Sequence, residues 1–131
     1  MQQKIRYTLK AEDRLKSRKQ ISVLFAHGKQ FTLFPFKIIW HFTPDRVGLQ
    51  CGFAVSSRNF KKAVDRNYIK RRMREAYRLQ KPELVAACLE KKQGLHLFFM
   101  YIGKEKPTYS LCAEKMNQAL QRLKKITDEM D

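Results

Sequence analysis

Acidic side chains are scarce in this sequence of 131 residues. It holds 12 Asp and Glu against 28 Lys and Arg, a formal net charge of +16. Such an excess of one sign opposes compaction and favours a polyanionic partner, with nucleic acid ahead of an anionic membrane. The scarcity also argues against a protein nuclease, since such enzymes cluster carboxylates around metal ions. We therefore expect neither catalytic residues nor a metal site in this chain.

Cysteine and histidine are also rare, with three of each. The cysteines at positions 51, 88 and 112 form no C-x-x-C pair, so we expect no disulfide framework, no zinc site and a reduced setting. The most apolar run, "LHLFFMYIG", is too short to cross a bilayer, and no secretory signal is visible. Glycine patterns of nucleotide-binding loops are absent as well. These absences predict a soluble cytoplasmic protein without a membrane partner.

The hydrophobic pattern predicts a single domain over residues 1–131. Hydrophobic residues make up 44% of the chain, enough to fill a core at this length. Residues 1–16 are basic without periodicity and are predicted to form an N-terminal arm. Residues 17–126 are predicted to form the folded domain, and residues 127–131 an acidic tail.

Alternating side chains predict strands, and apolar residues three and four apart predict helices. Ser17 and Gln20 form a capping box for a first helix that Gly28 is predicted to end. Asn59 is predicted to cap the longest helix, and Gly94 to end the helix after it. The strands are expected at residues 29–34, 36–42, 47–57 and 95–103, and the helices at 17–28, 60–80, 82–92 and 110–126. The order is α-β-β-β-α-α-β-α, which indicates one mixed sheet with helices packed on it.

The stretch "KKAVDRNYIKRRMREAYR", residues 61–78, holds eight Lys or Arg against two acids. With residues placed about 100° apart around a helix, Ile69, Met73, Ala76 and Tyr77 form a stripe that faces the core. One arc beside this stripe, called the basic arc below, holds Arg66, Asn67, Lys70, Arg71, Arg74 and Arg78. Cations four residues apart along it repel by a few tenths of a kcal/mol per pair. An anionic partner would offset that repulsion, and guanidinium groups suit bidentate phosphate contact.

Other functions fit this helix less well. A merely solvated helix would mix the two signs of charge evenly. A membrane-binding or calmodulin-binding helix would expose an apolar face, which is needed here for the core. A DNA-binding helix-turn-helix would need a partner helix, whereas this helix lies among predicted strands. A ribosomal or other structured-RNA-binding protein without a processing role remains an alternative.

At these residues the sequence resembles the bacterial ribonuclease P protein subunit. The resemblance covers residues 14–103 and includes "RLKSRKQISVLFAHGKQF" and "GFAVSSRNFKKAV". The family signature is Arg-Asn-Arg followed by Ile-Lys-Arg and a further Arg. It is matched here by Arg66, Asn67, Ile69, Lys70, Arg71 and Arg74, while Tyr68 stands where the second Arg of the triplet is usual.

The resemblance implies an α/β (α+β) two-layer sandwich, with a mixed four-stranded sheet and a left-handed β-α-β crossover. It also implies the protein component of a hydrolase, the endoribonuclease that forms the 5′ end of tRNA. Such a protein binds a catalytic ribonuclease P RNA subunit and the 5′ leader of precursor tRNA. The RNA subunit carries the chemistry with Mg²⁺, and no further protein partner is expected.

The resemblance assigns two sets of site residues. The basic helix and the loop before it would face the RNA subunit, through Arg58, Lys61, Lys62, Arg66, Asn67, Lys70, Arg71, Arg74 and Arg78. A cleft between the first helix and the sheet would receive the single-stranded leader, at Ile21, Phe25, Phe36 and Ile39. Ile21 replaces an aromatic residue usual in the family, so Phe36 or Trp40 would supply a second ring. Unpaired bases could stack there, beside a strand face of small residues.

Overall fold

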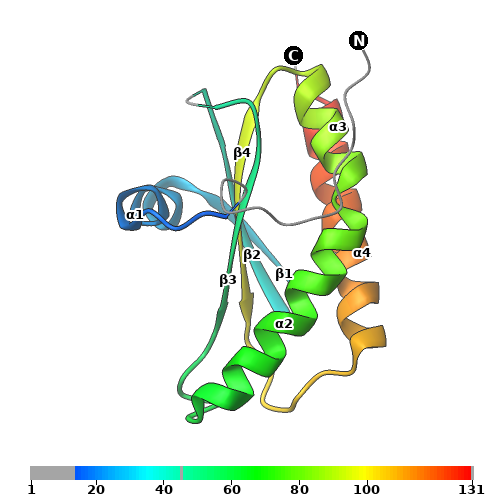
Figure 1. The fold of residues 1–131 in the computed structure, drawn as a ribbon. Helices are drawn as coiled ribbons and strands as arrows, with labels where there is room; N and C mark the ends of the chain where they lie inside the picture. The colour runs from blue at the N-terminus through cyan, green and yellow to red at the C-terminus, as the bar shows by residue number, and fades with distance from the viewer. Residues whose placement is uncertain (1–13, 45, 131) are drawn as a thin grey trace.

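The structure, a computed structural model, describes residues 14–44 and 46–130, and its elements follow the expected order. The helices are α1 (Arg18–His27), α2 (Ala63–Gln80), α3 (Pro82–Glu90) and α4 (Tyr109–Asp128). The strands are β1 (Lys29–Leu33), β2 (Phe36–Thr43), β3 (Gly48–Val55) and β4 (Gly94–Tyr101). Figure 1 shows the sheet edge-on, with α2, α3 and α4 on one face and α1 alone on the other. The sandwich of sheet and helices is confirmed, and α1 adds partial cover to the second face.

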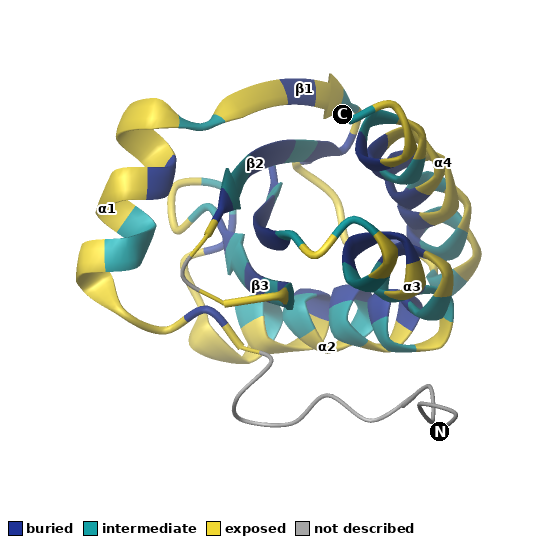
Figure 2. Cartoon of the chain, turned by 90° about the horizontal axis from the view of Figure 1, so that it is seen from above, coloured by how far each residue is buried: buried dark blue, intermediate teal, exposed yellow. Residues whose placement is uncertain are grey.

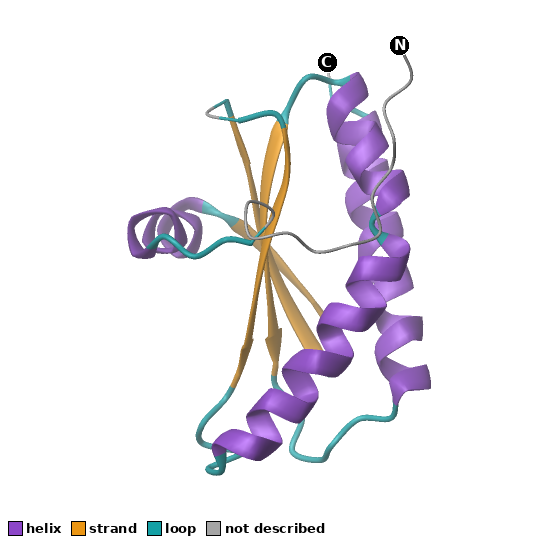
Figure 3. Ribbon diagram, in the orientation of Figure 1, coloured by secondary structure: helices purple, strands orange, loops and turns teal. Residues whose placement is uncertain are grey.

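The sheet is mixed, with strand order β1-β2-β4-β3. β2 pairs antiparallel with β1 and β4, whereas β3 pairs parallel with β4. Helices α2 and α3 connect these two parallel strands (Figure 3). The central strand β4 is buried along nearly all its length, as its continuous apolar run predicts. The mixed sheet and the β-α-β connection are confirmed, and the left hand of the crossover stays a prediction.

The main hydrophobic core fills the space between the sheet and α2, α3 and α4. Alternation along β2 directs Phe36 and Ile38 into it, where both are fully buried. The predicted stripe of α2 meets them, since its members are all buried: Ile69, Met73, Ala76 and Tyr77. Figure 2 shows these buried surfaces turned inward and the outer sides of the helices exposed. The predicted phase of α2 is therefore confirmed, which fixes where its basic arc points.

A smaller cluster lies on the opposite face of the sheet, beneath α1. It consists of Leu15, Leu24, Ile39 and Phe98. Gly52 of β3 makes room for it, because a Cβ there would lie 2.7 Å from the Phe98 ring and 3.3 Å from the Leu15 carbonyl oxygen. The small-residue face of β3 is thus filled by the protein at this point and does not present a flat surface for bases there.

Helix α2 begins later than expected. Its first residue is Ala63, and Lys62 precedes it without a side-chain capping bond. The Asn59 amide instead donates to the carbonyl oxygens of Ile102 and Gly103. Asn59 therefore ties the loop before α2 to the end of β4, and the prediction that it caps the helix was wrong.

At two further glycines, backbone oxygens leave no room for a Cβ. At Gly28 a Cβ would lie 2.4 Å from the Leu24 carbonyl oxygen, so this residue ends α1 as expected, although its backbone is extended. At Gly94 a Cβ would collide with the carbonyl oxygens of Thr43 and Arg46. Gly94 is the first residue of β4, so the prediction that it ends the preceding helix was wrong.

The folded domain extends beyond its predicted limits of 17 and 126. At the N-terminal side, the Leu15 amide donates to the carbonyl oxygen of Cys51 at 3.0 Å, and Arg14 forms a parallel bridge with the same strand. At the C-terminal side, α4 continues to Asp128 and Thr127 is fully buried. Residues 14–16 and 127–128 therefore belong to the domain, while the rest of the predicted arm, residues 1–13, lies outside the described residues.

Candidate nucleic-acid interface

The basic arc lies on a side of α2 that points away from the core. Asn67 and Arg71 are exposed, and Lys70 and Arg74 are half-buried beside the core stripe. Within residues 14–44 and 46–130, no hydrogen bond or ion pair engages the side chains of Lys70, Arg71 and Arg74. These three cations can therefore contact an external anion without breaking an internal bond.

The arc continues from α2 onto the residues that precede α1. Partial burial lowers the pKa of Arg74, and the positive charge of nearby Arg14 lowers it further. The second effect shows that two cations lie near each other where Arg14 meets the outer edge of β3. An anion bound between these two side chains would relieve that repulsion.

Two members of the basic arc already have partners in the chain. The Arg66 guanidinium donates to the carbonyl oxygens of Phe60 and Lys61, each at 2.8 Å, and so holds the loop that enters α2. Arg78 pairs with Glu75, with an Nε to Oε2 distance of 3.2 Å. RNA contacts by Arg66 and Arg78 stay predictions, and they would form alongside these internal bonds.

The charged side chains Asp65 and Arg72 on the opposite flank of α2 are engaged by internal contacts. Asp65 forms an ion pair with Lys106 at 2.8 Å. Arg72 donates to the Tyr68 hydroxyl at 2.9 Å, and its guanidinium lies 4.9 Å from the centre of the Tyr68 ring. Lys106 approaches the same ring at 5.6 Å. Tyr68, which replaces the second arginine of the family triplet, thus belongs to a flank whose cations are engaged.

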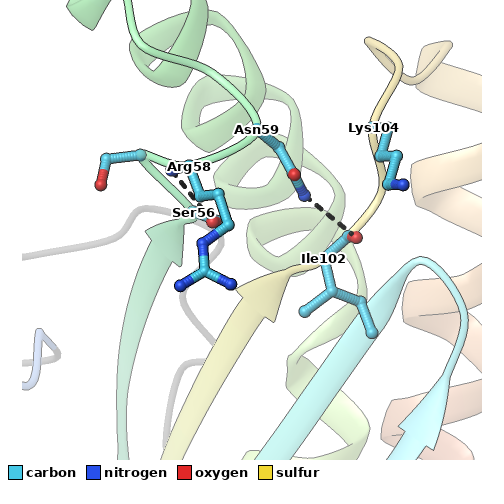
Figure 4. Close-up of a pocket in the computed structure, with 6 residues that line it drawn as sticks. Ser56, Arg58, Asn59, Ile102 and Lys104 are labelled. Atoms are coloured by element: carbon cyan, nitrogen blue, oxygen red, sulfur yellow. Dashed lines mark hydrogen bonds between the residues drawn. The ribbon is translucent and has the colours of Figure 1, made fainter.

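The remaining residues predicted to bind RNA lie just before α2. Arg58, Lys61 and Lys62 are all exposed. Arg58 borders an open hollow that it shares with Ser56 and with Lys104 from the loop after β4 (Figure 4). The structure therefore brings these three cations to the N-terminal end of α2, next to the basic arc.

Three of the four residues predicted for the leader cleft lie on the α1 face of the sheet. Phe25 is 47% exposed, and its ring meets Phe98 edge-on with 5.2 Å between the ring centres. Ile39 is buried beneath α1, and Ile21 packs half-buried against the same cluster. This face therefore presents one exposed aromatic ring on an apolar base.

Phe36 and Trp40 do not belong to that face. Both point from β2 into the main core, with 0% and 8% of their surface exposed, whereas Ile39 points the opposite way. Because alternate residues of a strand point to opposite faces, Phe36 cannot line a cleft together with Ile39. The prediction of Phe36 in the cleft was wrong, as was Trp40 as a second ring. The second ring on this face is Phe98 of β4, which is 8% exposed and packs beneath Phe25. The continuous apolar run of β4 carried no signal that could have found it.

Other chemistry finds little support in the part of the chain that the structure describes. No group of three or more His, Cys, Asp or Glu side chains there could hold a metal ion. No helix among these residues is both long enough and apolar enough to cross a bilayer. The arrangement can bind phosphates along α2 and stack an unpaired base near Phe25. Fold and surface together define a small, basic α+β protein of the RNA-binding class.

Comparisons with known proteins identify the family within this class. The family model described as ribonuclease P matches residues 9–124. The ribonuclease P protein component of Porphyromonas gingivalis is 30% identical over 119 residues, which cover 89% of this chain and 87% of that protein. The component of the same name from Chlorobium phaeobacteroides is 32% identical over 129 residues, with coverage of 89% and 88%. The chain belongs to the ribonuclease P protein family.

A solved structure supports the fold. The RNase P protein of Staphylococcus aureus superimposes with a TM-score of 0.59 at 18% sequence identity. The match covers 91% of this chain and 98% of that one. The sheet and its helices are thus shared across nearly the whole length of both proteins.

Proposed function

We propose that this protein acts as the protein component of ribonuclease P and promotes removal of the 5′ leader from precursor tRNA. It binds the RNA subunit through the basic arc and the loop before α2. The observation that carries the proposal is the asymmetry of charge around α2. Among the described residues, Lys70, Arg71 and Arg74 lack internal partners, whereas Arg72 on the opposite flank is engaged by Tyr68.

The basic arc would act on the RNA subunit by neutralising phosphates. Each phosphate contact releases counterions, which makes binding favourable at low salt and progressively weaker as salt rises. Mg²⁺ would enter through the RNA subunit, where it serves the chemistry. Because the protein and Mg²⁺ both reduce repulsion among RNA phosphates, the protein should lower the Mg²⁺ concentration that the RNA needs.

The leader would lie on the α1 face, next to the basic arc. Arg14 and Leu15 pass along the outer edge of β3, where Leu15 joins the cluster beneath α1 and Arg14 approaches Arg74. A single strand could therefore place a base on the Phe25 ring while its phosphates meet this positive charge. Stacking on an exposed ring is tolerant of sequence, which suits a leader of variable sequence.

Reconstitution tests this function directly. With a bacterial ribonuclease P RNA, the protein should increase cleavage of precursor tRNA, most strongly at low Mg²⁺ and low salt. The protein alone, treated with nuclease to remove bound RNA, should cut nothing. Specific cleavage by the RNA-free protein would contradict the proposal. A structured-RNA-binding protein without a processing role would bind RNA in the same salt-dependent way but would not promote this cleavage.

A further inference from the structure

A groove at one end of the sheet combines apolar, aromatic and basic side chains. Phe34 and Pro35 from the turn between β1 and β2 line it, together with Lys104 and Pro107 from the loop after β4 and Leu111 of α4. Phe34 is 66% exposed, an unusual position for an aromatic ring without a ligand or partner. The groove includes Leu111 of α4, and α4 packs on the face of the sheet opposite α1. The groove is therefore separate from the α1 face.

The strand register places this groove beside the start of the basic helix. Phe36, Tyr101 and Val55 pair across neighbouring strands, so β3 and β4 both end where the turn at Phe34 lies. Helices α2 and α4 begin at this same end, the lower end in Figure 1. The positive ends of two helix dipoles therefore add to the charge of the nearby side chains.

Lys104, Lys106 and the acidic Glu105 line the groove, and further cations lie in the loop before α2. Residues 56–65 and 102–108 hold five Lys or Arg against two acids, and one of those acids, Asp65, is paired with Lys106. Lys104 is exposed and borders both the groove and the adjoining hollow, across which Arg58 lies (Figure 4). A basic rim thus runs from the Phe34 turn to the N-terminal end of the basic arc.

Internal bonds hold the walls of the groove in place. The Ile102 amide donates to the Pro35 carbonyl oxygen at 2.8 Å and so ties the end of β4 to the turn. The Tyr101 hydroxyl donates to the carbonyl oxygen of Glu105 within the loop. The Asn59 amide donates to the Ile102 carbonyl oxygen from the other side. A surface held in this way loses little conformational entropy when it binds a ligand.

We propose that this groove binds one unpaired nucleotide of the RNA subunit, with its base stacked on Phe34 and its phosphates near Lys104 and Arg58. The inference rests on the proposed function and adds a contact outside the basic arc and the α1 face. An exposed ring flanked by cations is the combination that single-stranded nucleic-acid sites use. A paired base could not reach the ring, so the groove would take a bulged or looped nucleotide. The RNA subunit is the source because the groove continues into the N-terminal end of α2.

Substitutions of Phe34 test the stacking contact. Equilibrium binding of the RNA subunit should weaken by about 5- to 100-fold for Phe34→Ala, the range expected for loss of one stacked base. The Phe34→Leu variant should bind the RNA subunit nearly as weakly, because leucine keeps apolar area but lacks the ring. The Phe34→Trp variant should keep the native affinity, and the fluorescence of its new tryptophan should be quenched when RNA binds. The native Trp40 is only 8% exposed and should contribute little to that change.

Val47→Ala is the matched control. Val47 is 46% exposed and lies at the opposite end of the sheet, just before β3. Its removal should leave affinity unchanged. Circular dichroism should show that all variants are folded, since Phe34 contributes little buried surface.

Several results would overturn the inference. Binding by Phe34→Ala or Phe34→Leu equal to that of the unsubstituted protein would remove the stacking contact but leave the proposed function intact. A dimer that Phe34→Ala dissociates in sedimentation would identify a second copy as the occupant. Loss of preference for leader-bearing substrate in Phe34→Ala would assign the groove to the leader instead. Failure of the unsubstituted protein to bind the RNA subunit would overturn the proposed function and the inference together.

Discussion

Arg66 differs from its neighbours on the basic arc because its guanidinium is already bonded within the chain. Its two bonds to the carbonyl oxygens of Phe60 and Lys61 close the loop that leads into α2. Helix α2 has no side-chain cap, so these bonds, together with those of Asn59 to the end of β4, hold its entry. Arg74, by contrast, gains no bond among the described residues and is disfavoured by burial and by Arg14. Two arginines of the same signature thus differ in what they do for the free protein.

Arg66→Ala should destabilise the free protein. The loss of two charge-assisted bonds at a partly exposed site should lower the free energy of unfolding by about 1–2 kcal/mol. Urea denaturation measures this change, with Arg71→Ala as a control because Arg71 is exposed and unpaired among the described residues. Equal stability of the two variants would show that the Arg66 bonds contribute nothing in solution.

Helix α2 has two flanks of different character, and Tyr68 lies on the one whose cations have internal partners. Its ring is approached by Arg72 and Lys106, and its hydroxyl accepts a bond from Arg72. An arginine at this position restores the family triplet but faces away from Lys70 and Arg74. The contact that the family makes with this second arginine is therefore not expected to govern affinity here.

Tyr68→Arg should change affinity for the RNA subunit by less than about threefold. It should also lower the free energy of unfolding by about 0.5–1 kcal/mol, since it removes cation–π contacts and adds a third cation to the cluster. Fluorescence titration with RNA and thermal unfolding give the two values. A gain in affinity of about tenfold or more would show that this flank also meets the RNA.

Patterns within single elements predicted most of this fold, and contacts between elements account for the errors. The stripe through Ile69 and Met73 was visible in the sequence because a helix repeats about every 3.6 residues. The role of Asn59 was not visible, because its partners Ile102 and Gly103 lie more than forty residues away. Phe98 was missed for a related reason. A continuous apolar run shows that a strand is buried but not which of its residues meets α1.

The candidate site was predictable to a similar extent. The sequence placed five of the six cations of α2 on one arc, which the buried stripe now supports. It could not show which of them have internal partners, since the bonds of Arg66 depend on the path of the preceding loop. It also could not place Arg14 beside Arg74, because the two are sixty residues apart in the chain.

All three cysteines are buried as free thiols on the side of the main core. Burial raises the pKa of Cys88 to about 12 and that of Cys112 to about 11, and it raises the pKa of Cys51 well above its usual range. The folded state therefore favours the neutral thiols. Their contribution to stability is complete below the unfolded pKa, near 9, and is lost as the pH rises towards the folded values.

These thiols should resist modification in the folded protein. With the pKa of Cys112 near 11, only about one thiol in a thousand is ionised at about pH 8. A disulfide reagent should react slowly with native protein and rapidly with all three thiols in guanidinium chloride. Rapid reaction of a native cysteine would show that the packing of its helix or strand on the core is looser than described.

For the whole molecule, the number of cations that contact phosphate predicts how RNA binding depends on salt. About five phosphate contacts give a slope of roughly −3.5 to −4.5 in a plot of log binding constant against log salt concentration. Titrations of the RNA subunit at several salt concentrations measure this slope. A flat response would contradict binding through cations on α2 and its preceding loop.

The central claim is that the arrangement of charge on α2, not its total, binds the RNA subunit. Arg74→Ala and Arg72→Ala each remove one positive charge from the same helix, two residues apart. Loss of Arg74 should weaken binding by about 1–3 kcal/mol, as expected for a charge-assisted phosphate contact. Loss of Arg72, which is engaged by Tyr68, should cost only a few tenths of a kcal/mol, as for an exposed charge outside the contact.

The deciding measurement is therefore the pair of dissociation constants of Arg74→Ala and Arg72→Ala with the RNA subunit, at one salt concentration. Circular dichroism should first show that both variants are folded. The account predicts clearly weaker binding for Arg74→Ala and nearly unchanged binding for Arg72→Ala. Equal losses in the two variants would contradict it and would show that bulk charge, not the basic arc, binds the RNA.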